Sequence, residues 1–253
     1  MTSAVLVARP RERAAVRNIS CSACTAREQS FCHVLAHAMN LPRVEVPRPV
    51  QEIRTVPARR FICRKPDFLT HVPIICRGWA MSGVLLSDGS RQILSFLLPG
   101  DFASPALLFD PRPNCFVEAI TDVTYRAFRR GDLKDLIFAD PDLAERLSRL
   151  WVDEKRRADE TIVDLGRRPA AERIARLILG LVERLEPGAL GSGRPVEVEF
   201  PLRQHHIADA IGLTPVHVSK LLTEFRRNGL IRLSERSLTI LDTARFRAVA
   251  QLR

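Results

Sequence analysis

The sequence predicts an α+β protein with three parts: a domain of short strands, one long helix, and a small domain that combines helices with a pair of strands. Three observations support this order. Short apolar segments separated by turn residues occupy roughly residues 53–130. An apolar repeat of three and four residues runs through residues 140–165, and two short helical segments followed by two short strand segments lie near the C-terminus.

The composition is that of a globular protein with room for two hydrophobic cores. The chain has 253 residues, of which 46% are hydrophobic and 27% are charged. No uncharged apolar run approaches the roughly 18 residues that would cross a bilayer, and the N-terminal charge order is the reverse of a secretory signal. We therefore expect a cytoplasmic protein with no membrane partner, in which closely spaced cysteines serve metal or redox chemistry.

The strand segments of the first domain are short and alternate with turns. The turn signals are Ser87-Asp88-Gly89, Pro99-Gly100-Asp101 and Asp110-Pro111-Arg112-Pro113. Strands at this spacing are typical of a small barrel or jelly roll. The candidate strands are RRFICR, HVPIICRGWAMSGVLL, RQILSFLL, CFVEAI and VTYRAF.

The long helix is expected over residues 139–166, with Gly166 as its end. Its middle, from Asp153 to Arg157, is crowded with charges, so its apolar stripe is interrupted. Such a stripe can pack against its own domain or against an identical helix in a dimer, and periodicity alone does not choose between them. The residues of the stripe are Leu143, Leu147, Leu150, Trp151, Ala158, Ile162 and Leu165.

A second helix, PAAERIARLILGLVERLE, begins near Pro169, which is allowed in a first helical turn. A glycine-rich loop and a short alternating strand, VEVEFPL, follow it. The boundary between the two domains is therefore expected near residues 166–170.

The segment IADAIGLTPVHVSKLLTEFRRNGL contains two short helices joined by a tight turn. Gly212 ends the first helix, Thr214 is a good N-cap and Pro215 a good first-turn residue for the second, and Gly229 stops the second. This pattern predicts a helix-turn-helix. The residues expected to face its core are Ile207, Ala208, Ile211, Val218, Leu221, Leu222 and Phe225.

Two short strands around Ser234-Glu235-Arg236 extend this unit into a winged helix-turn-helix. Residues 169–253 contain 13 Lys/Arg and 9 Asp/Glu, a basic balance that suits DNA as a partner. The start of the second helix enters the major groove in such motifs, which points to Val216, His217, Ser219 and Lys220. Lys220 can bind guanine, Ser219 a base or phosphate, Val216 a thymine methyl and His217 a base edge or phosphate. The expected phosphate contacts are Arg203, Gln204, Arg226 and Arg227.

The order of these parts, with the motifs LPGDF, PAAERIARLILGL and IADAIGLTPVHVSKLL, resembles the CRP/FNR superfamily of transcription regulators over roughly residues 50–250. The resemblance implies an N-terminal arm (1–50), a β-roll sensor domain (51–138), a dimerisation helix (139–166) and a winged helix-turn-helix DNA-binding domain (167–253). It also implies a homodimer on a palindromic double-stranded DNA site, with RNA polymerase as a further partner.

Three cysteines lie ahead of the strand domain in CSACTAREQSFC, a C-x2-C-x7-C pattern that resembles one branch of FNR-type oxygen sensors. That resemblance implies that Cys21, Cys24 and Cys32 hold a 4Fe–4S cluster, with thiolates as the usual ligands of such clusters. A zinc site, a thiol–disulfide switch and a cluster that senses nitric oxide remain open alternatives.

The fourth ligand is less evident, because the position that the family gives to its last cysteine holds Tyr125 here. We predict a hairpin of CFVEAI and VTYRAF that turns at Thr121-Asp122, in which Cys115 faces Phe128 and Tyr125 faces Glu118. Cys115 would then lie roughly 10 Å from the family's position, and it is the predicted fourth ligand. Cys63 and Cys76 are the alternatives, and both have the pattern of buried strand residues.

The DNA-reading residues differ from those of FNR proteins. FNR proteins carry a glutamate, serine and arginine where this chain has Val216, Ser219 and Lys220, which predicts a different half-site.

Two other functions have less support in the sequence. Relatives that bind cAMP have a glutamate and an Arg-Ser pair that GDFASPALLFDPRPNCF lacks, so we expect no cAMP. The strand region holds only His71, which leaves no histidine cluster for a barrel metalloenzyme, and we expect no enzymatic activity.

Overall fold

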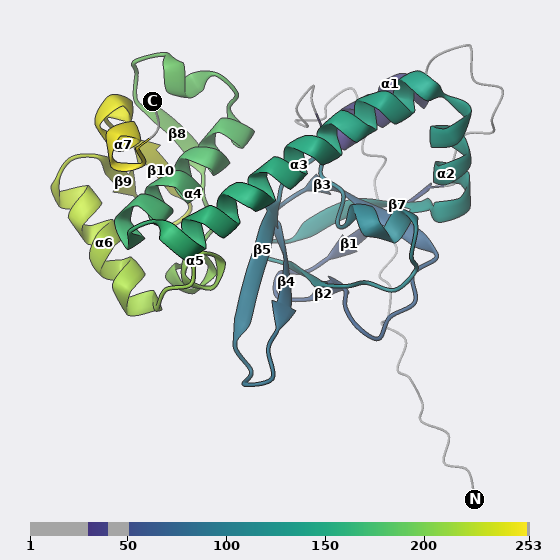
Figure 1. Cartoon of the computed structure of the whole chain (residues 1–253), viewed down its shortest axis with the longest axis horizontal. Coiled ribbons are helices and arrows are strands. Elements are labelled where there is room, and N and C mark those ends of the chain that lie inside the picture. Colours follow the sequence, from purple (N-terminus) through teal and green to yellow (C-terminus); the bar gives the residue numbers. More distant parts are fainter. Residues whose placement is uncertain (1–29, 40–50, 252–253) are drawn as a thin grey trace, which may run out of the picture.

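The computed structural model describes residues 30–39 and 51–251 (Figure 1). A strand-rich domain and a helical domain lie side by side, and the long helix α3 runs across both. The predicted α+β architecture is thus confirmed. No helix in the described part of the chain is long and apolar enough to cross a membrane.

Two antiparallel sheets form the β-roll. The first has the order β1-β7-β3 and the second the order β2-β6-β4-β5. The strands are β1 (Gln51–Val56), β2 (Phe61–Cys63), β3 (His71–Arg77), β4 (Ala80–Leu85), β5 (Arg91–Leu97), β6 (Phe116–Ala119) and β7 (Val123–Arg129).

The predicted hairpin of residues 115–128 is wrong. Strand β6 pairs with β2 and β4, whereas β7 pairs with β1 and β3, so the two strands belong to different sheets. Cys115 therefore does not face Phe128, and Glu118 faces Met81 and Phe61 rather than Tyr125. Adjacent strands in sequence usually pair, but here the chain changes sheets between them.

The corner between β6 and β7 depends on Gly78. Its φ is +83°, and a Cβ at this position would lie 2.2 Å from the backbone oxygen of Asp122, so only glycine fits. The Thr121 Oγ1 accepts from the Trp79 backbone N–H at 2.9 Å, and Ile120 donates to Trp79 O at 2.8 Å. These contacts fix the chain where it leaves one sheet for the other.

Two helices that the sequence pattern did not reveal cover the β-roll. Helix α1 (Phe31–Met39) packs along the long helix α3, and α2 (Arg130–Ala139) directly precedes α3 in the chain. The Phe31 ring packs edge-on against Phe102, with centroids 4.6 Å apart, which anchors α1 on the β-roll. A short 3-10 helix, Pro105–Leu108, lies between β5 and β6.

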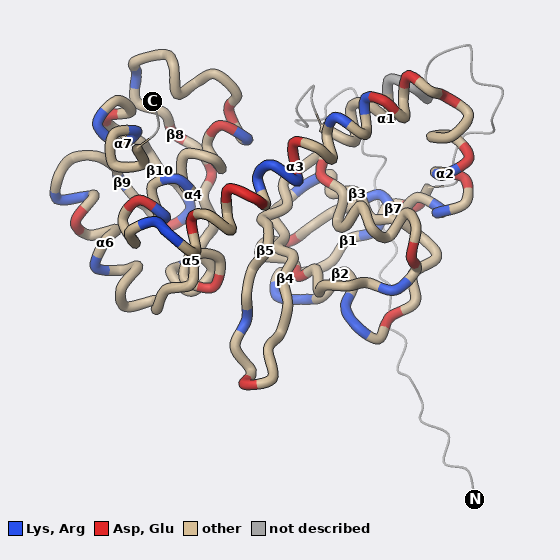
Figure 2. The backbone as a smooth tube through the Cα atoms, in the orientation of Figure 1, with Lys and Arg blue, Asp and Glu red and all other residues tan. Residues whose placement is uncertain are grey.

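The long helix α3 (Pro141–Arg167) begins at the Asp140 N-cap, whose side chain accepts from two backbone N–H groups. Gly166 lies inside its last turn and does not end it, because the stop comes from Arg168 ahead of Pro169. Acidic and basic residues alternate along its exposed middle (Figure 2). We expected either packing on its own domain or packing in a dimer. The first half does pack internally, with Leu143 and Leu147 buried in the β-roll core.

The second half of α3 leaves apolar side chains uncovered. Ile162 is 68% exposed and Val163 is 46% exposed in the single chain. A helix that is buried at one end and apolar but exposed at the other has a face available for a second copy. The first half of α3 therefore packs on its own domain, and the second half has a face that a second copy of the chain can cover.

The C-terminal domain contains four helices and a small sheet of order β8-β10-β9. The predicted helix-turn-helix and the strand pair of the wing are confirmed. The elements are α4 (Ala170–Leu185), β8 (Val196–Glu199), α5 (Gln204–Ile211), α6 (Pro215–Arg227), β9 (Ile231–Leu233), β10 (Ser237–Ile240) and α7 (Thr243–Val249).

One hydrophobic cluster joins the C-terminal domain to the β4–β5 side of the β-roll. Trp79 packs edge-on against Phe200, with ring centroids 6.3 Å apart. Arg91 pairs with Asp209 at 3.0 Å across the same boundary. The two domains are therefore held together by apolar and charged contacts at once.

Candidate nucleic-acid interface and cysteine positions

The helix-turn-helix is built by two local capping events. Gly212 ends α5 in the left-handed conformation, with φ +65°. Thr214 then caps α6, its Oγ1 accepting from the His217 N–H at 3.2 Å, and Pro215 follows in the first turn. All the residues expected to face the core are buried except Leu221, which is partly buried: Ile207, Ala208, Ile211, Val218, Leu222 and Phe225.

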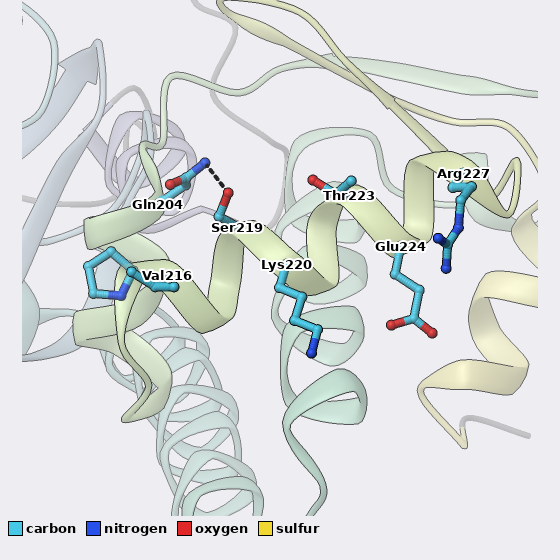
Figure 3. A pocket seen from close by; sticks show the side chains of 8 residues that line it. Gln204, Val216, Ser219, Lys220, Thr223, Glu224 and Arg227 are labelled. Carbon is cyan, nitrogen blue, oxygen red and sulfur yellow. Dashed lines mark hydrogen bonds between the residues drawn. The ribbon is translucent and has the colours of Figure 1, made fainter.

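The predicted base-reading residues lie on the outer face of α6. Val216 is 80% exposed, and His217 and Lys220 are also exposed. Ser219 is half-buried because Gln204 of α5 donates to its Oγ at 3.1 Å (Figure 3). A groove runs along this face, and it is lined by Gln204, Pro215, Val216, Ser219, Lys220, Thr223, Glu224 and Arg227. The structure thus brings together Val216, Ser219 and Lys220 in one groove.

Two of the predicted phosphate contacts line this groove: Gln204 at the start of α5 and Arg227 at the end of α6. The other two, Arg203 and Arg226, line an adjoining hollow, and Arg226 donates to Thr223 Oγ1 at 3.1 Å. Lys220 and Arg227 are both exposed, so both charges face solvent. Sequence reasoning did not single out Thr223 and Glu224, which the α6 helical repeat places on the same face.

The sequence analysis assigned no role to His206, which is a buried residue in the first turn of α5. Its Nδ1 accepts from the Arg203 backbone N–H at 3.1 Å, which requires a neutral ring. Burial lowers the pKa of His206 to about 3, with further lowering from the charges of His205, Arg91 and Arg203. The imidazole is thus a neutral acceptor that fixes the entry into the helix-turn-helix.

The sequence patterns also did not predict the polar contacts between the two domains. Arg184 of α4 forms an ion pair with Asp101 and donates to the Phe96 carbonyl at 2.9 Å. The Gln92 amide donates to the Ala210 carbonyl at 3.1 Å. Asp101 belongs to the LPGDF motif and Arg184 closes the helix PAAERIARLILGLVER, but only the fold brings the two motifs together.

The cysteines divide into two groups. Cys21 and Cys24 lie outside the described residues. Cys32 lies in the first turn of α1, buried in the β-roll core cluster, and its backbone N–H donates to the Gly100 carbonyl at 3.2 Å. The third cysteine of the motif is therefore attached to the turn that contains Asp101.

Cys63 lies on the second sheet, and Cys115 lies close to it at the edge of that sheet. Cys63 of β2 pairs with Val117 of β6, and Cys115 immediately precedes β6. Burial raises the pKa of the Cys63 thiol to about 12, and the nearby Cys115 raises it further. Burial likewise raises the pKa of Cys115. Both are protonated thiols in this surrounding at neutral pH.

The structure removes the geometric argument for Cys115 as the fourth ligand. Tyr125 pairs with Arg54 on one side and with Ile75 on the other, in the first sheet. Cys76 follows Ile75 directly and lies at a β-bulge between Ile75 and Arg77. Cys76, rather than Cys115, is thus the cysteine next to the position that the resemblance gives to the fourth ligand.

The described residues contain no group of three or more His, Cys, Asp or Glu side chains that could hold a metal ion. With two of the predicted ligands outside the described ranges, a four-cysteine site is not tested by this geometry. The expected ligand set of Cys21, Cys24, Cys32 and Cys115 stays a prediction.

Two family models match the chain. Residues 53–140 match a cyclic nucleotide-binding domain, and residues 172–249 match a Crp-like helix-turn-helix domain. Together they cover the β-roll and the DNA-binding domain.

Curated relatives and solved structures agree with this division. The transcriptional activatory protein AadR of Rhodopseudomonas palustris is 31% identical over 227 residues, 90% of this chain and 91% of the relative. The nitrogen fixation regulation protein FixK of Bradyrhizobium diazoefficiens is 39% identical over 166 residues, 66% of this chain and 68% of the relative. The structure of FixK2 from Bradyrhizobium japonicum superposes with a TM-score of 0.69 at 28% identity, covering 79% of this chain and 97% of that chain.

Proposed function

Because this chain is a DNA-binding transcription regulator of the CRP/FNR family, whose helix-turn-helix members act as dimers, we propose that it senses oxygen or redox state through a 4Fe–4S cluster on its N-terminal cysteines. The observation that carries the proposal is the attachment of Cys32 to Gly100. The next residue, Asp101, forms the ion pair with Arg184 of the DNA-binding domain. The cysteine segment and the DNA-binding domain therefore share one turn.

The donor set fits such a cluster in its chemistry, because cysteine thiolates are its usual ligands. Cys32 is buried against the β-roll, so a group held there would be partly shielded from solvent. When bound, a 4Fe–4S cluster supplies a centre that oxygen degrades. We keep Cys21, Cys24 and Cys32 as three of its ligands.

The coupling to DNA binding runs through residues of this chain. A shift of α1 acts on Gly100 through the Cys32 hydrogen bond, and Asp101 moves with its neighbour. The Asp101 carboxylate also accepts from the Leu98 N–H at 2.7 Å, so the turn is stiff. Arg184 then passes a displacement of this turn to α4, which packs against α5 and α7 of the DNA-binding domain.

Dimerisation and DNA binding are linked by α3. The exposed Ile162 and Val163 provide the apolar face for a second copy, and the charged middle of the helix sets how readily the two copies pair. A two-fold dimer presents two α6 helices to successive major grooves and reads a palindromic site. Lys220 then contacts guanine, Ser219 a base or phosphate, and Val216 a thymine methyl.

Three further parts of the proposal follow from the family. RNA polymerase is the expected partner on DNA. A cyclic nucleotide is not the expected ligand, because GDFASPALLFDPRPNCF lacks the glutamate and the Arg-Ser pair of cAMP-binding members, and Asn114-Cys115 lies near the place of that pair. The relatives are named as regulators, which supports the expectation that the chain is not an enzyme.

The test is purification without oxygen, followed by measurement of iron, sulfide, zinc and visible absorption. DNA affinity for a site selected from a random pool, and the molar mass in solution, are measured before and after exposure to air. We expect about four iron and four sulfide per chain, and weaker dimerisation and DNA binding after air. The Cys21→Ser/Cys24→Ser double variant is the control, and it should be colourless and insensitive to air.

A colourless, iron-free wild-type chain that still dimerises and binds DNA would overturn the cluster while leaving the regulator intact. Zinc at one per chain would favour the zinc site, and a mass loss of two hydrogen atoms on oxidation would favour a disulfide. A cluster that resists air but is degraded by nitric oxide would favour the nitric oxide signal.

A further inference from the structure

A side-chain hydrogen bond connects the two helices of the helix-turn-helix. The Gln204 amide nitrogen donates to Ser219 Oγ at 3.1 Å. Gln204 is the first residue of α5, and Ser219 lies in the second turn of α6. Figure 3 shows the amide nitrogen directed at the Ser219 hydroxyl, and both side chains line the groove on the outer face of α6. A residue expected to contact phosphate is thus bonded to a residue expected to read DNA.

The Ser219 hydroxyl keeps its hydrogen available. A serine hydroxyl has one hydrogen to donate and two lone pairs that accept, and the Gln204 amide fills one lone pair. A serine inside a helix commonly donates that hydrogen to the carbonyl four residues earlier, as Ser148 of α3 does to Ala144 at 2.8 Å. In the part of the chain that the structure describes, Ser219 makes no such bond to the Pro215 carbonyl. Its hydrogen is therefore not taken by a protein acceptor and can be given to DNA.

We infer that Gln204 is a positioning residue that sets the base preference of Ser219: it fills a lone pair of the Ser219 oxygen, so that the hydroxyl meets a base edge as a hydrogen-bond donor. In the major groove this donor can bind guanine N7 or O6, adenine N7 or thymine O4, whereas cytosine presents an amino donor there. The pair therefore disfavours cytosine at one position of each half-site. The inference deepens the DNA-binding function and rests on it, but it does not depend on the proposed cluster.

The neighbouring side chains of the groove present donors as well. Thr223, one helical turn after Ser219, has its Oγ1 lone pair filled by Arg226 at 3.1 Å, so this second hydroxyl is also an acceptor toward the protein. Lys220 lies next to Ser219 on α6, is exposed, and has donors only. The carboxylate in the groove lining, Glu224, lies one turn beyond Lys220, toward the end of α6. The part of α6 nearest to Gln204 therefore faces DNA with hydrogens to donate, which suits bases that offer acceptors.

The spacing between Gln204 and Ser219 is fixed by the core beneath them. The Arg203 backbone N–H, one residue before Gln204, donates to the buried His206 ring at 3.1 Å and holds the start of α5 in place. Ile207 of α5 and Val218 of α6 are both buried in the same hydrophobic cluster. The amide and the hydroxyl are thus brought together before DNA arrives, so the orientation of the hydroxyl costs little entropy on binding.

The experiment uses the full-length chain and a DNA site that the wild type selects from a random pool. Fluorescence anisotropy then measures the affinity for all four bases at each position of the half-site. Ser219→Ala identifies the position that Ser219 reads, because discrimination should be lost there and retained elsewhere. At that position we expect the wild type to disfavour cytosine about tenfold.

Two variants of Gln204 test its role as a positioning residue. Gln204→Met keeps the length of the side chain without the amide donor, so the hydroxyl turns freely and discrimination against cytosine should fall below about threefold. In Gln204→Glu the carboxylate only accepts, so it takes the hydrogen of Ser219 and leaves its lone pairs to DNA. Cytosine, with its amino donor, should then become favoured at that position by about threefold or more. The added negative charge weakens binding to every DNA, so the affinities are compared as ratios between bases.

Gln51→Met on β1 is the control with the same chemical change, and it should keep the affinity and the base preference of the wild type. Circular dichroism with thermal unfolding verifies that each variant is folded. A wild type that binds no DNA overturns the DNA-binding function and this inference together. Equal weakening of Gln204→Met on all four bases overturns the inference alone and makes Gln204 a phosphate contact. If Gln204→Glu does not come to favour cytosine, the assignment of Ser219 as a donor is overturned.

Discussion

The DNA-binding domain and the β-roll differ in how far apart their interacting residues lie in the sequence. In the helix-turn-helix, the contacts that decide the fold are local: Thr214 caps a helix that begins one residue later. In the β-roll, Gln51 pairs with Phe128, and β6 and β7 separate into two sheets although a single short turn joins them. Local patterns therefore specify the DNA-binding surface, whereas the cysteine environment depends on long-range topology.

The largest expected loss of stability comes from a substitution at the boundary between the β-roll and the DNA-binding domain. In Asp101→Asn the amide oxygen can still accept from Leu98, but the negative charge opposite Arg184 is lost. Both side chains of that pair are about 15% exposed, so the variant removes the carboxylate partner of a largely buried guanidinium. We expect a loss of about 3 kcal/mol in the free energy of unfolding. Urea denaturation measures it.

Asp88→Asn is the matched control, because Asp88 lies in an exposed turn and bonds only to its neighbour Ser90 among the contacts described. It should change the free energy of unfolding by less than about 0.5 kcal/mol. Equal losses in the two variants would contradict the importance of the interdomain pair.

The second prediction concerns His206, a buried residue of the DNA-binding domain that the local sequence patterns did not single out. The pKa of His206 is about 3 in the folded chain, against roughly 6.5 when unfolded. The unfolded state therefore binds more protons between these values, and the free energy of unfolding falls as the pH drops below about 6.5. At pH 5 the loss is about 2 kcal/mol.

His206→Gln should remove most of this pH dependence, because glutamine has no proton to gain and its oxygen can still accept from the Arg203 N–H. Urea denaturation from pH 7.5 to 5 gives the slope. His217→Gln is the control, since His217 is exposed on α6, and its slope should equal that of the wild type. An unchanged slope in His206→Gln would mean that His206 is not held neutral.

The sequence was sufficient for the elements whose signals are local. Gly212, Thr214 and Pro215 fix the turn of the helix-turn-helix, and the apolar repeat fixes α3 to within two residues at its start and one at its end. The surface residues Val216, Ser219 and Lys220 followed directly, because a helical repeat determines which side chains face outward once the buried face is known.

The sequence was insufficient where two distant segments meet. CFVEAI and VTYRAF have the composition of a hairpin, yet the corner at Gly78 and Asp122 sends them into different sheets. The predicted distance between Cys115 and the family's ligand position depended on that hairpin. Arg184 and Asp101 are 83 residues apart, and the sequence pattern of neither segment predicts that they form an ion pair. Helix α1 does begin at a local cap, since the Ser30 Oγ accepts from the His33 N–H at 3.2 Å, but its position on the β-roll comes from the packing of Phe31 on Phe102.

The third prediction concerns the surface that was derived from local patterns. Lys220→Ala should weaken binding to the specific DNA site about tenfold, which corresponds to about 1.4 kcal/mol, because one donor to guanine is lost. Binding to unrelated DNA should weaken less. Fluorescence anisotropy at several salt concentrations measures both affinities. Arg194→Ala, in the exposed loop before β8, is the control with the same change in charge. An equal weakening on both DNAs would assign Lys220 to phosphate.

The smallest expected effect tests where the two halves of α3 divide. Lys155 and Asp159 form an ion pair one helical turn apart, and their side chains are 71% and 53% exposed. Such a pair stabilises a helix by less than about 0.5 kcal/mol, so Lys155→Ala should change the free energy of unfolding by no more than that, and less in high salt. Urea denaturation at two protein concentrations measures the value. A loss above about 1 kcal/mol that grows with protein concentration would place Lys155 inside the dimer seam, since only a contact buried by the second copy responds to dilution. The boundary between the half of α3 that packs on its own β-roll and the half that pairs with a second copy would then lie before Lys155 rather than nearer Ile162.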